Sequence, residues 1–206
     1  MDNFGQLMGL LSASNRLARD RIDLHPRSTW QSQFVRMAMA SSLAPDSAAL
    51  SDIGVSVGGR FGAGIEREVE TLAMEIYGGQ AAVASLSCGT QASLAVHGMV
   101  LEAGDRVIAS VGRGSSRMDV ARRFSGCEVW SLPISEDGSG VDLDGLRDLL
   151  VKGGVRAVVL AGEAFLFPLP LAEIGEMCRA NGAWLFYDMS GVAGLLAGHA
   201  FQPDVP

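Results

Sequence analysis

From about residue 65 onward, short apolar runs alternate with amphipathic runs of helical spacing. Ile65, Val69, Leu72 and Ile76 recur every three to four residues, which predicts a helix. Further helical runs are predicted near residues 115–124, 142–151 and 170–180, and apolar runs predict strands at 81–86, 107–110, 129–132, 158–161 and 184–187. This alternation predicts an α/β fold with a core of ordinary domain size.

Residues 1–60 have a different character. They contain two predicted helices, around residues 4–17 and 30–43, followed by a Ser/Gly-rich passage at 52–59. Leading segments with apolar faces and no sheet of their own pack onto the body of the protein or onto a neighbouring subunit. We therefore predict an amino-terminal helical arm at 1–60 and a larger domain at 61–206.

Charge and hydropathy exclude several classes of partner. The net charge is −7 and the pI is about 4.9, without a basic run, which argues against nucleic acid and anionic membranes. The apolar run at 157–161 is far shorter than the roughly 20 residues that cross a bilayer, and residues 1–4 lack the features of a signal peptide. We expect no membrane partner and no export.

The cysteines and histidines indicate a reducing compartment and no metal site. Three widely spaced cysteines without a Cys-x-x-Cys pair are typical of reduced thiols, so a cytoplasmic location is predicted. The histidines, none at metal-ligand spacing, are His25, His97 and His199. His97 lies in the helix predicted after residue 88, where packing or solvent exposure is expected. His199 lies near the carboxylate motif described next, which leaves a site role open for it.

A carboxylate follows the last predicted strand. Residues 184–187 lead into Asp188 and a small-residue turn. An acid at the carboxyl end of a buried strand suits a cationic ring nitrogen, such as that of pyridoxal phosphate. An enzyme with that cofactor also needs a Schiff-base lysine, and the chain contains one lysine, Lys152. It precedes a strand, at the end of the sheet opposite to the one where open α/β folds bind ligands.

Five collinear motifs together carry a family resemblance. They are Gly58-Gly59-Arg60-Phe61, residues 66–70, Ser87-Cys88-Gly89-Thr90-Gln91-Ala92-Ser93, Gly104-Asp105 and residues 188–195. In order and spacing they are similar to the amino-terminal half of serine hydroxymethyltransferase. The resemblance implies the large domain of a fold type I pyridoxal phosphate enzyme, a three-layer sandwich with a mostly parallel sheet.

The same resemblance implies a set of cofactor-binding residues. Cys88, Gly89 and Thr90 occupy the phosphate-binding turn, where backbone N–H groups at a helix start face an anion, although such a turn also serves as an ordinary helix cap. Asp188 matches the acid that pairs with the pyridine nitrogen, and its alternative role is that of a helix cap. Ser115 or Arg117 falls where the family carries a ring-stacking histidine.

Other positions depart from the family. Its second histidine is Gly191 here, its catalytic glutamate falls near Gly54, its tyrosine pair is replaced at residues 61–62, and the serine near the ring hydroxyl falls at about Glu163. These changes remove acid/base and stacking groups while retaining those for phosphate and ring nitrogen. Serine–glycine conversion with folate is therefore not expected.

Three interpretations stay open at this point. In the first, the chain is one subunit of a split enzyme for aldol-type or hydroxymethyl transfer on a small amino acid. It binds pyridoxal phosphate only with a partner, a lysine-bearing carboxyl-terminal half or related subunit, in a hetero-oligomer. In the second, it is a non-catalytic scaffold or binding subunit of the same fold. In the third, the 206 residues are part of a longer chain.

Overall fold

The computed structural model describes residues 3–22, 31–41, 57–110, 126–161 and 165–203. The chain divides into two compact units, Met1–Ala40 and Ser41–Pro206. The boundary predicted between residues 60 and 61 falls inside helix α3 (Val57–Tyr77), and the division into arm and domain stays a prediction.

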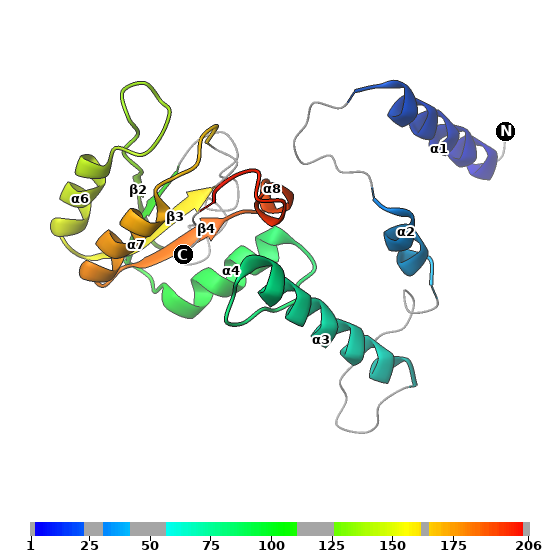
Figure 1. Cartoon of the computed structure of the whole chain (residues 1–206), viewed down its shortest axis with the longest axis horizontal. Helices are drawn as coiled ribbons and strands as arrows, with labels where there is room; N and C mark the ends of the chain where they lie inside the picture. The colour runs from blue at the N-terminus through cyan, green and yellow to red at the C-terminus, as the bar shows by residue number, and fades with distance from the viewer. Residues whose placement is uncertain (1–2, 23–30, 42–56, 111–125, 162–164, 204–206) are drawn as a thin grey trace. The chain divides into compact units, whose positions relative to one another are not determined.

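The first unit contains helices α1 (Asn3–Asp20) and α2 (Gln33–Met39), at the two positions where the sequence predicts them (Figure 1). Helix α2 begins after Ser32, whose hydroxyl accepts a hydrogen bond from the Val35 N–H at 3.3 Å. None of the described residues of this unit is buried, and α1 exposes Phe4, Leu7 and Leu10. The described part of this unit therefore has amphipathic helices without a core of its own.

A parallel sheet forms the centre of the second unit. Its strands are β1 (Arg106–Ala109), β2 (Glu128–Ser131), β3 (Val155–Ala161) and β4 (Trp184–Asp188), in the spatial order β2-β1-β3-β4. The register pairs Ala109 with Val159, and Ala161 with Asp188. The chain first adds β2 on one side of β1 and then returns to add β3 on the other, which creates a topological switch point between β1 and β3.

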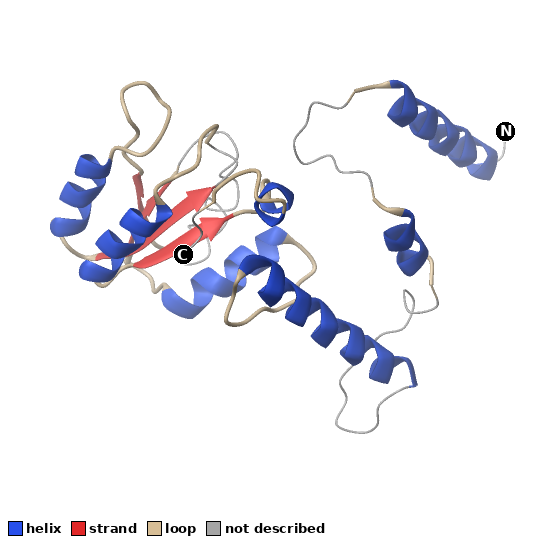
Figure 2. Ribbon diagram, in the orientation of Figure 1, coloured by secondary structure: helices blue, strands red, loops and turns tan. Residues whose placement is uncertain are grey.

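Helices cover both faces of this sheet (Figure 2). On one face, α6 (Leu143–Val151) and α7 (Leu171–Ala180) pack on Val158 and Leu160 of β3. On the other face, Ala157 and Val159 of β3 form a cluster with Leu101, at the end of α4 (Gly89–Val100). Successive strand residues point to opposite faces, so an uninterrupted apolar strand fills two cores. The predicted three-layer α/β architecture is confirmed.

Residues 81–86 do not form the strand that the sequence predicts. The segment has no regular secondary structure, and Val83 is 69% exposed. The Ala84 N–H bonds the carboxylate of Glu70 on α3 at 3.1 Å instead of a neighbouring strand. An alanine-rich segment has low strand propensity, and this one connects α3 to α4. The helix predicted near 115–124 lies outside the described residues.

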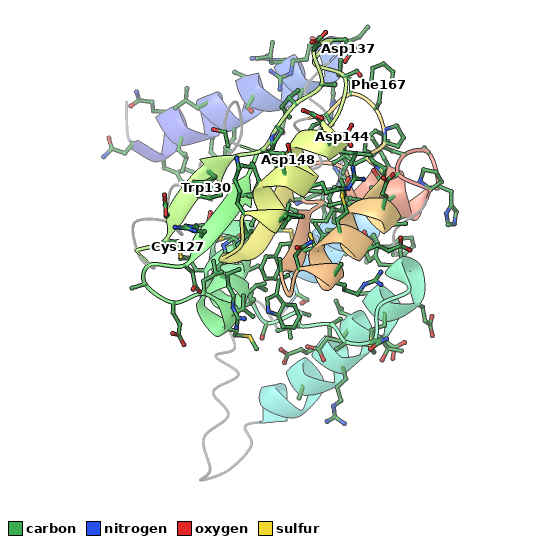
Figure 3. The ribbon with its side chains drawn as sticks, turned by 90° about the vertical axis from the view of Figure 1, so that its left-hand side faces the viewer. Cys127, Trp130, Asp137, Asp144, Asp148 and Phe167 are labelled. Carbon is green, nitrogen blue, oxygen red and sulfur yellow. The ribbon has the colours of Figure 1, made fainter. Side chains whose placement is uncertain are left out.

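The loop between β2 and α6 is held by its own polar side chains. Asp137 accepts hydrogen bonds from the Ser139 N–H at 3.0 Å and the Ser135 hydroxyl at 2.8 Å, and these bonds lower its pKa to about 2. Figure 3 shows Asp137 and Phe167, which follow β2 and β3, at one end of the sheet and Cys127, which precedes β2, at the other. The connections after the strands therefore gather at the carboxyl end.

A buried glutamine closes the carboxyl-terminal part of the described chain onto the connection after β3. The Gln202 side chain is 3% exposed, accepts from the Leu169 N–H at 2.7 Å and donates to the Leu169 carbonyl at 2.6 Å. Gln202 has a φ of 53°, a backbone conformation that non-glycine residues adopt rarely. This two-bond contact ties the segment after α8 (Ala193–Ala197) to the start of α7.

Candidate functional site

The carboxyl ends of β1, β3 and β4 form one side of a cleft with a volume of about 490 Å³. Helix α4 and the end of α3 form the other side. The lining is mostly apolar, and it consists of Tyr77, Gly89, Ala92, Ser93, Val96, His97, Ala109, Ser110, Val159, Ala161, Phe186, Tyr187, Asp188, Met189, Ser190 and Ala193. Because the cleft lies at the switch point of a parallel sheet, it is where ligands bind in open α/β folds.

Asp188 is the last residue of β4, opposite Ala161 in the register. Its Oδ1 atom accepts hydrogen bonds from the N–H of Ser190 at 3.0 Å and from the Ser190 hydroxyl. This turn orients a half-buried carboxylate at the cleft. Such a carboxylate can pair with a cation or a protonated ring nitrogen.

Helix α4 begins at the other side of the cleft. Its N-cap, Cys88, has an extended backbone and makes no side-chain capping hydrogen bond. The Ser87 N–H, just before the helix, bonds the side-chain oxygen of Gln91 at 2.8 Å. The first turn of a helix carries backbone N–H groups without intrahelical partners and a partial positive charge, and both favour an anion. Gly89, the first residue of this turn, lines the cleft.

The structure therefore brings Gly89 and Asp188 together, as the resemblance implies for phosphate and ring-nitrogen groups. Cys88 precedes Gly89 at the helix start and is exposed, and Thr90 is half-buried in the first turn but does not line the cleft. Ser115 and Arg117 lie outside the described residues. The roles of these positions in cofactor binding stay predictions.

Lys152 is the C-cap of α6 and is followed by β3. It therefore lies at the amino end of the strand whose carboxyl end, Ala161, lines the cleft. A seven-residue strand is about 20 Å long, so a lysine side chain cannot span it. The one lysine of the chain does not reach the cleft.

His97 and Tyr77 are among the cleft residues that sequence reasoning missed. His97 is 6% exposed and lines the floor of the cleft, and Tyr77 of α3 donates a hydrogen bond to the Ala193 carbonyl at 3.4 Å across its rim. A signal for His97 was available, because Gly89, Ser93 and His97 are spaced by four residues and share one face of α4. No sequence signal was available for Tyr77, since its position depends on how α3 packs on α8. His199 is exposed and does not line the cleft.

No group of three or more metal-ligating side chains occurs among the residues described. Over the same residues, every helix is too short or too polar to span a bilayer. The cleft thus offers a helix start for an anion and a carboxylate for a cation, with apolar walls between them.

In sequence, the chain is similar to archaeal serine hydroxymethyltransferases. The chain is 32% identical over 145 residues to a serine hydroxymethyltransferase of Methanopyrus kandleri, and 29% identical over 145 residues to that of Methanosphaera stadtmanae. Each match covers 68% of this chain and 34% of the relative. This chain is serine hydroxymethyltransferase-like. It spans about a third of the length of these curated relatives, and no protein-family model matches it.

The fold has a close counterpart among solved structures. An L-threonine transaldolase from Pseudomonas fluorescens matches 98% of this chain and 50% of its own, with a TM-score of 0.74 and 23% identity. The serine hydroxymethyltransferase-like chain therefore has the fold of a fold type I pyridoxal phosphate enzyme.

Proposed function

We propose that this chain binds pyridoxal phosphate as one part of an enzyme for aldol-type or hydroxymethyl transfer on a small amino acid. A lysine-bearing carboxyl-terminal half or related subunit is its partner in a cytoplasmic hetero-oligomer. The observation that carries the proposal is the cleft that contains both the start of α4 and Asp188. The serine hydroxymethyltransferase relatives support the reaction class.

The residues present fit this cofactor. Cys88, Gly89 and Thr90 at the start of α4 would hold the phosphate through the backbone N–H groups of the first helical turn. Asp188 would hold the protonated ring nitrogen by charge. By the resemblance, Ser115 or Arg117 would take the place of the family's ring-stacking histidine. Pyridoxal phosphate, when bound, serves as the electron sink for a carbanion at the α-carbon of an amino acid.

The chain's own residues would bind and orient, and the partner would supply the covalent attachment. Lys152 lies at the far end of the sheet, so the proposal assigns the Schiff-base lysine to the partner. The family's glutamate and tyrosine positions are replaced in this sequence near residues 54 and 61–62, which argues against folate-dependent serine–glycine conversion. A different amino acid or aldehyde is the expected substrate.

The thiols support the assignment to the cytoplasm. Cys88, Cys127 and Cys178 form no disulfide, and two of them are buried in the second unit. Buried reduced cysteines are typical of proteins from reducing compartments.

A second candidate function is that of a non-catalytic scaffold. The replaced acid/base positions favour it, since a chain without them can stabilise an active relative without performing chemistry. The division of the chain into a helical arm (1–60) and a domain (61–206) is part of both proposals, because the arm would pack onto the neighbouring subunit in each.

Co-expression with a candidate lysine-bearing chain tests the proposal. We expect a stable complex that retains pyridoxal phosphate through gel filtration, and borohydride reduction should fix the cofactor to the partner's lysine and not to Lys152, as read by peptide mass spectrometry. Asp188→Asn should preserve the complex and weaken cofactor retention at least tenfold, because a charge-assisted hydrogen bond is lost. Asp144→Asn, on the exposed surface of α6, is the matched control.

Two results would decide against the proposal. Reduction that attached the cofactor to Lys152 in the chain alone would contradict the separation of lysine and cleft. A stable complex without cofactor, unaffected by Asp188→Asn, would favour the scaffold function.

A further inference from the structure

The imidazole of His97 is the most deeply buried ionisable group of the cleft. It belongs to the third turn of α4, and its Nδ1 atom is buried without a hydrogen-bond partner among the described residues. Buried polar atoms are nearly always paired, because an unpaired one loses its hydration without compensation. An unpaired nitrogen beside a cleft therefore indicates a group that completes its bonding when a ligand is present.

The ring packs against Phe186, on the face of the sheet that α4 covers. Its centroid lies 5.3 Å from that of Phe186, with an interplanar angle of 63°, an edge-to-face contact. Phe186 and Asp188 are two residues apart on β4, and residues with that spacing point to the same face. Phe186 belongs to the cluster on the α4 face, so Asp188 projects toward α4 as well.

His97 and Asp188 also interact through charge. Burial lowers the pKa of His97, and the negative charge of Asp188 opposes this and raises it. The other titratable groups that line the cleft are Tyr77 of α3 and Tyr187 of β4, and α4 carries no second one. Because burial dominates, the imidazole is neutral near pH 7, with one N–H donor and one acceptor nitrogen.

We propose that His97 is a positioning residue for the ligand of the cleft: its buried, unpaired Nδ1 atom contacts the group whose cation Asp188 binds. This nitrogen provides a further polar contact for the floor of the occupied cleft. The identity of the cation, the ring nitrogen of pyridoxal phosphate, rests on the proposed function.

The coupling is measurable in the full chain without any ligand. Imidazole NMR titration of the histidine-labelled chain should show a lower pKa for His97 in Asp188→Asn than in the unmodified chain, because the favourable negative charge is gone. Asp144→Asn, which removes a carboxylate from the exposed surface of α6 outside the cleft, should leave the His97 pKa unchanged. An unchanged His97 titration would overturn the inference whatever the cofactor does.

The assembly with the lysine-bearing partner provides the second measurement. His97→Phe preserves the ring packing and removes both nitrogens, and it should weaken pyridoxal phosphate retention about tenfold in equilibrium dialysis. His97→Gln, which keeps a donor and an acceptor, should recover part of that loss, and His199→Asn should cause none. Equal retention by the His97→Phe assembly would contradict the positioning role.

The two proposals fail separately. If the unmodified assembly retained no pyridoxal phosphate, the proposed function would be contradicted, while the titration in the ligand-free chain would still decide the coupling. If His97→Phe failed to fold, as judged by circular dichroism, the Asp188→Asn titration and the His97→Gln retention would decide it instead.

Discussion

At the scale of single residues, the three cysteines differ in what surrounds their sulfur atoms. Cys178 is 1% exposed in the core between α7 and the sheet, and burial raises its thiol pKa to about 11. Cys127 is buried and donates to the Glu102 carbonyl at 3.5 Å. Cys88 is exposed at the start of α4. The thiolate is the reactive form, so access and protonation together set the order of reaction.

We expect a maleimide at pH 7 to modify Cys88 first and Cys178 only after denaturation. The raised pKa keeps Cys178 protonated at every pH below about 11, and its burial blocks the reagent. Mass spectrometry of peptides after timed labelling measures the order, with Cys88→Ser as the control for site assignment. Rapid labelling of Cys178 in the native chain would show that α7 opens readily.

At the scale of elements, the four strands of the sheet were predictable because each is a mostly apolar run ended by a polar residue, a glycine or a proline. The absence of a strand at 81–86 was not predictable. Hydrophobicity alone does not reveal that the Ala84 N–H bonds the Glu70 carboxylate and not a neighbouring strand. The cleft was predictable where local sequence creates it, at the start of α4 and at Asp188. His97 and Tyr77 required the packing of α4 and α3, which local sequence does not contain.

The Gln202 contact is the element-scale feature with the clearest effect on stability. Gln202→Asn keeps an amide and tolerates positive φ, but its shorter side chain cannot reach both polar atoms of Leu169. We expect a loss of about 2 kcal/mol in the free energy of unfolding, because two buried backbone groups lose their partners. Urea unfolding followed by circular dichroism measures it, with Gln33→Asn on exposed α2 as control. A change below about 0.5 kcal/mol would contradict the role of this contact.

At the scale of the whole molecule, many large apolar side chains outside the core are exposed. Ile65, Val69, Leu72 and Ile76 of α3 form an apolar stripe along one side of the helix, each between 45% and 52% exposed. Helix α1 exposes further large apolar side chains, including Leu10 at 64%. Contiguous apolar patches of this kind are typical of interaction surfaces.

The isolated chain should therefore self-associate through the stripe on α3. Val69→Glu with Leu72→Lys adds opposite charges to the stripe and should shift the chain toward monomer in sedimentation velocity, without loss of helix content. Glu68→Gln with Glu75→Gln, at exposed positions of the same helix outside the stripe, is the matched control. An unmodified chain that sediments as a monomer at micromolar concentration would exclude this role.

The start of α4 has a consequence for how the chain could change by mutation. Cys88 occupies the N-cap but makes no side-chain capping hydrogen bond. A serine at an N-cap stabilises helices by about 1 kcal/mol. A serine cap would occupy one of the N–H groups that an anion needs. On the proposed function, helix stability and affinity for the phosphate therefore change in opposite directions at this position, and a laboratory variant stabilised by Cys88→Ser would be a poorer receptor for phosphate.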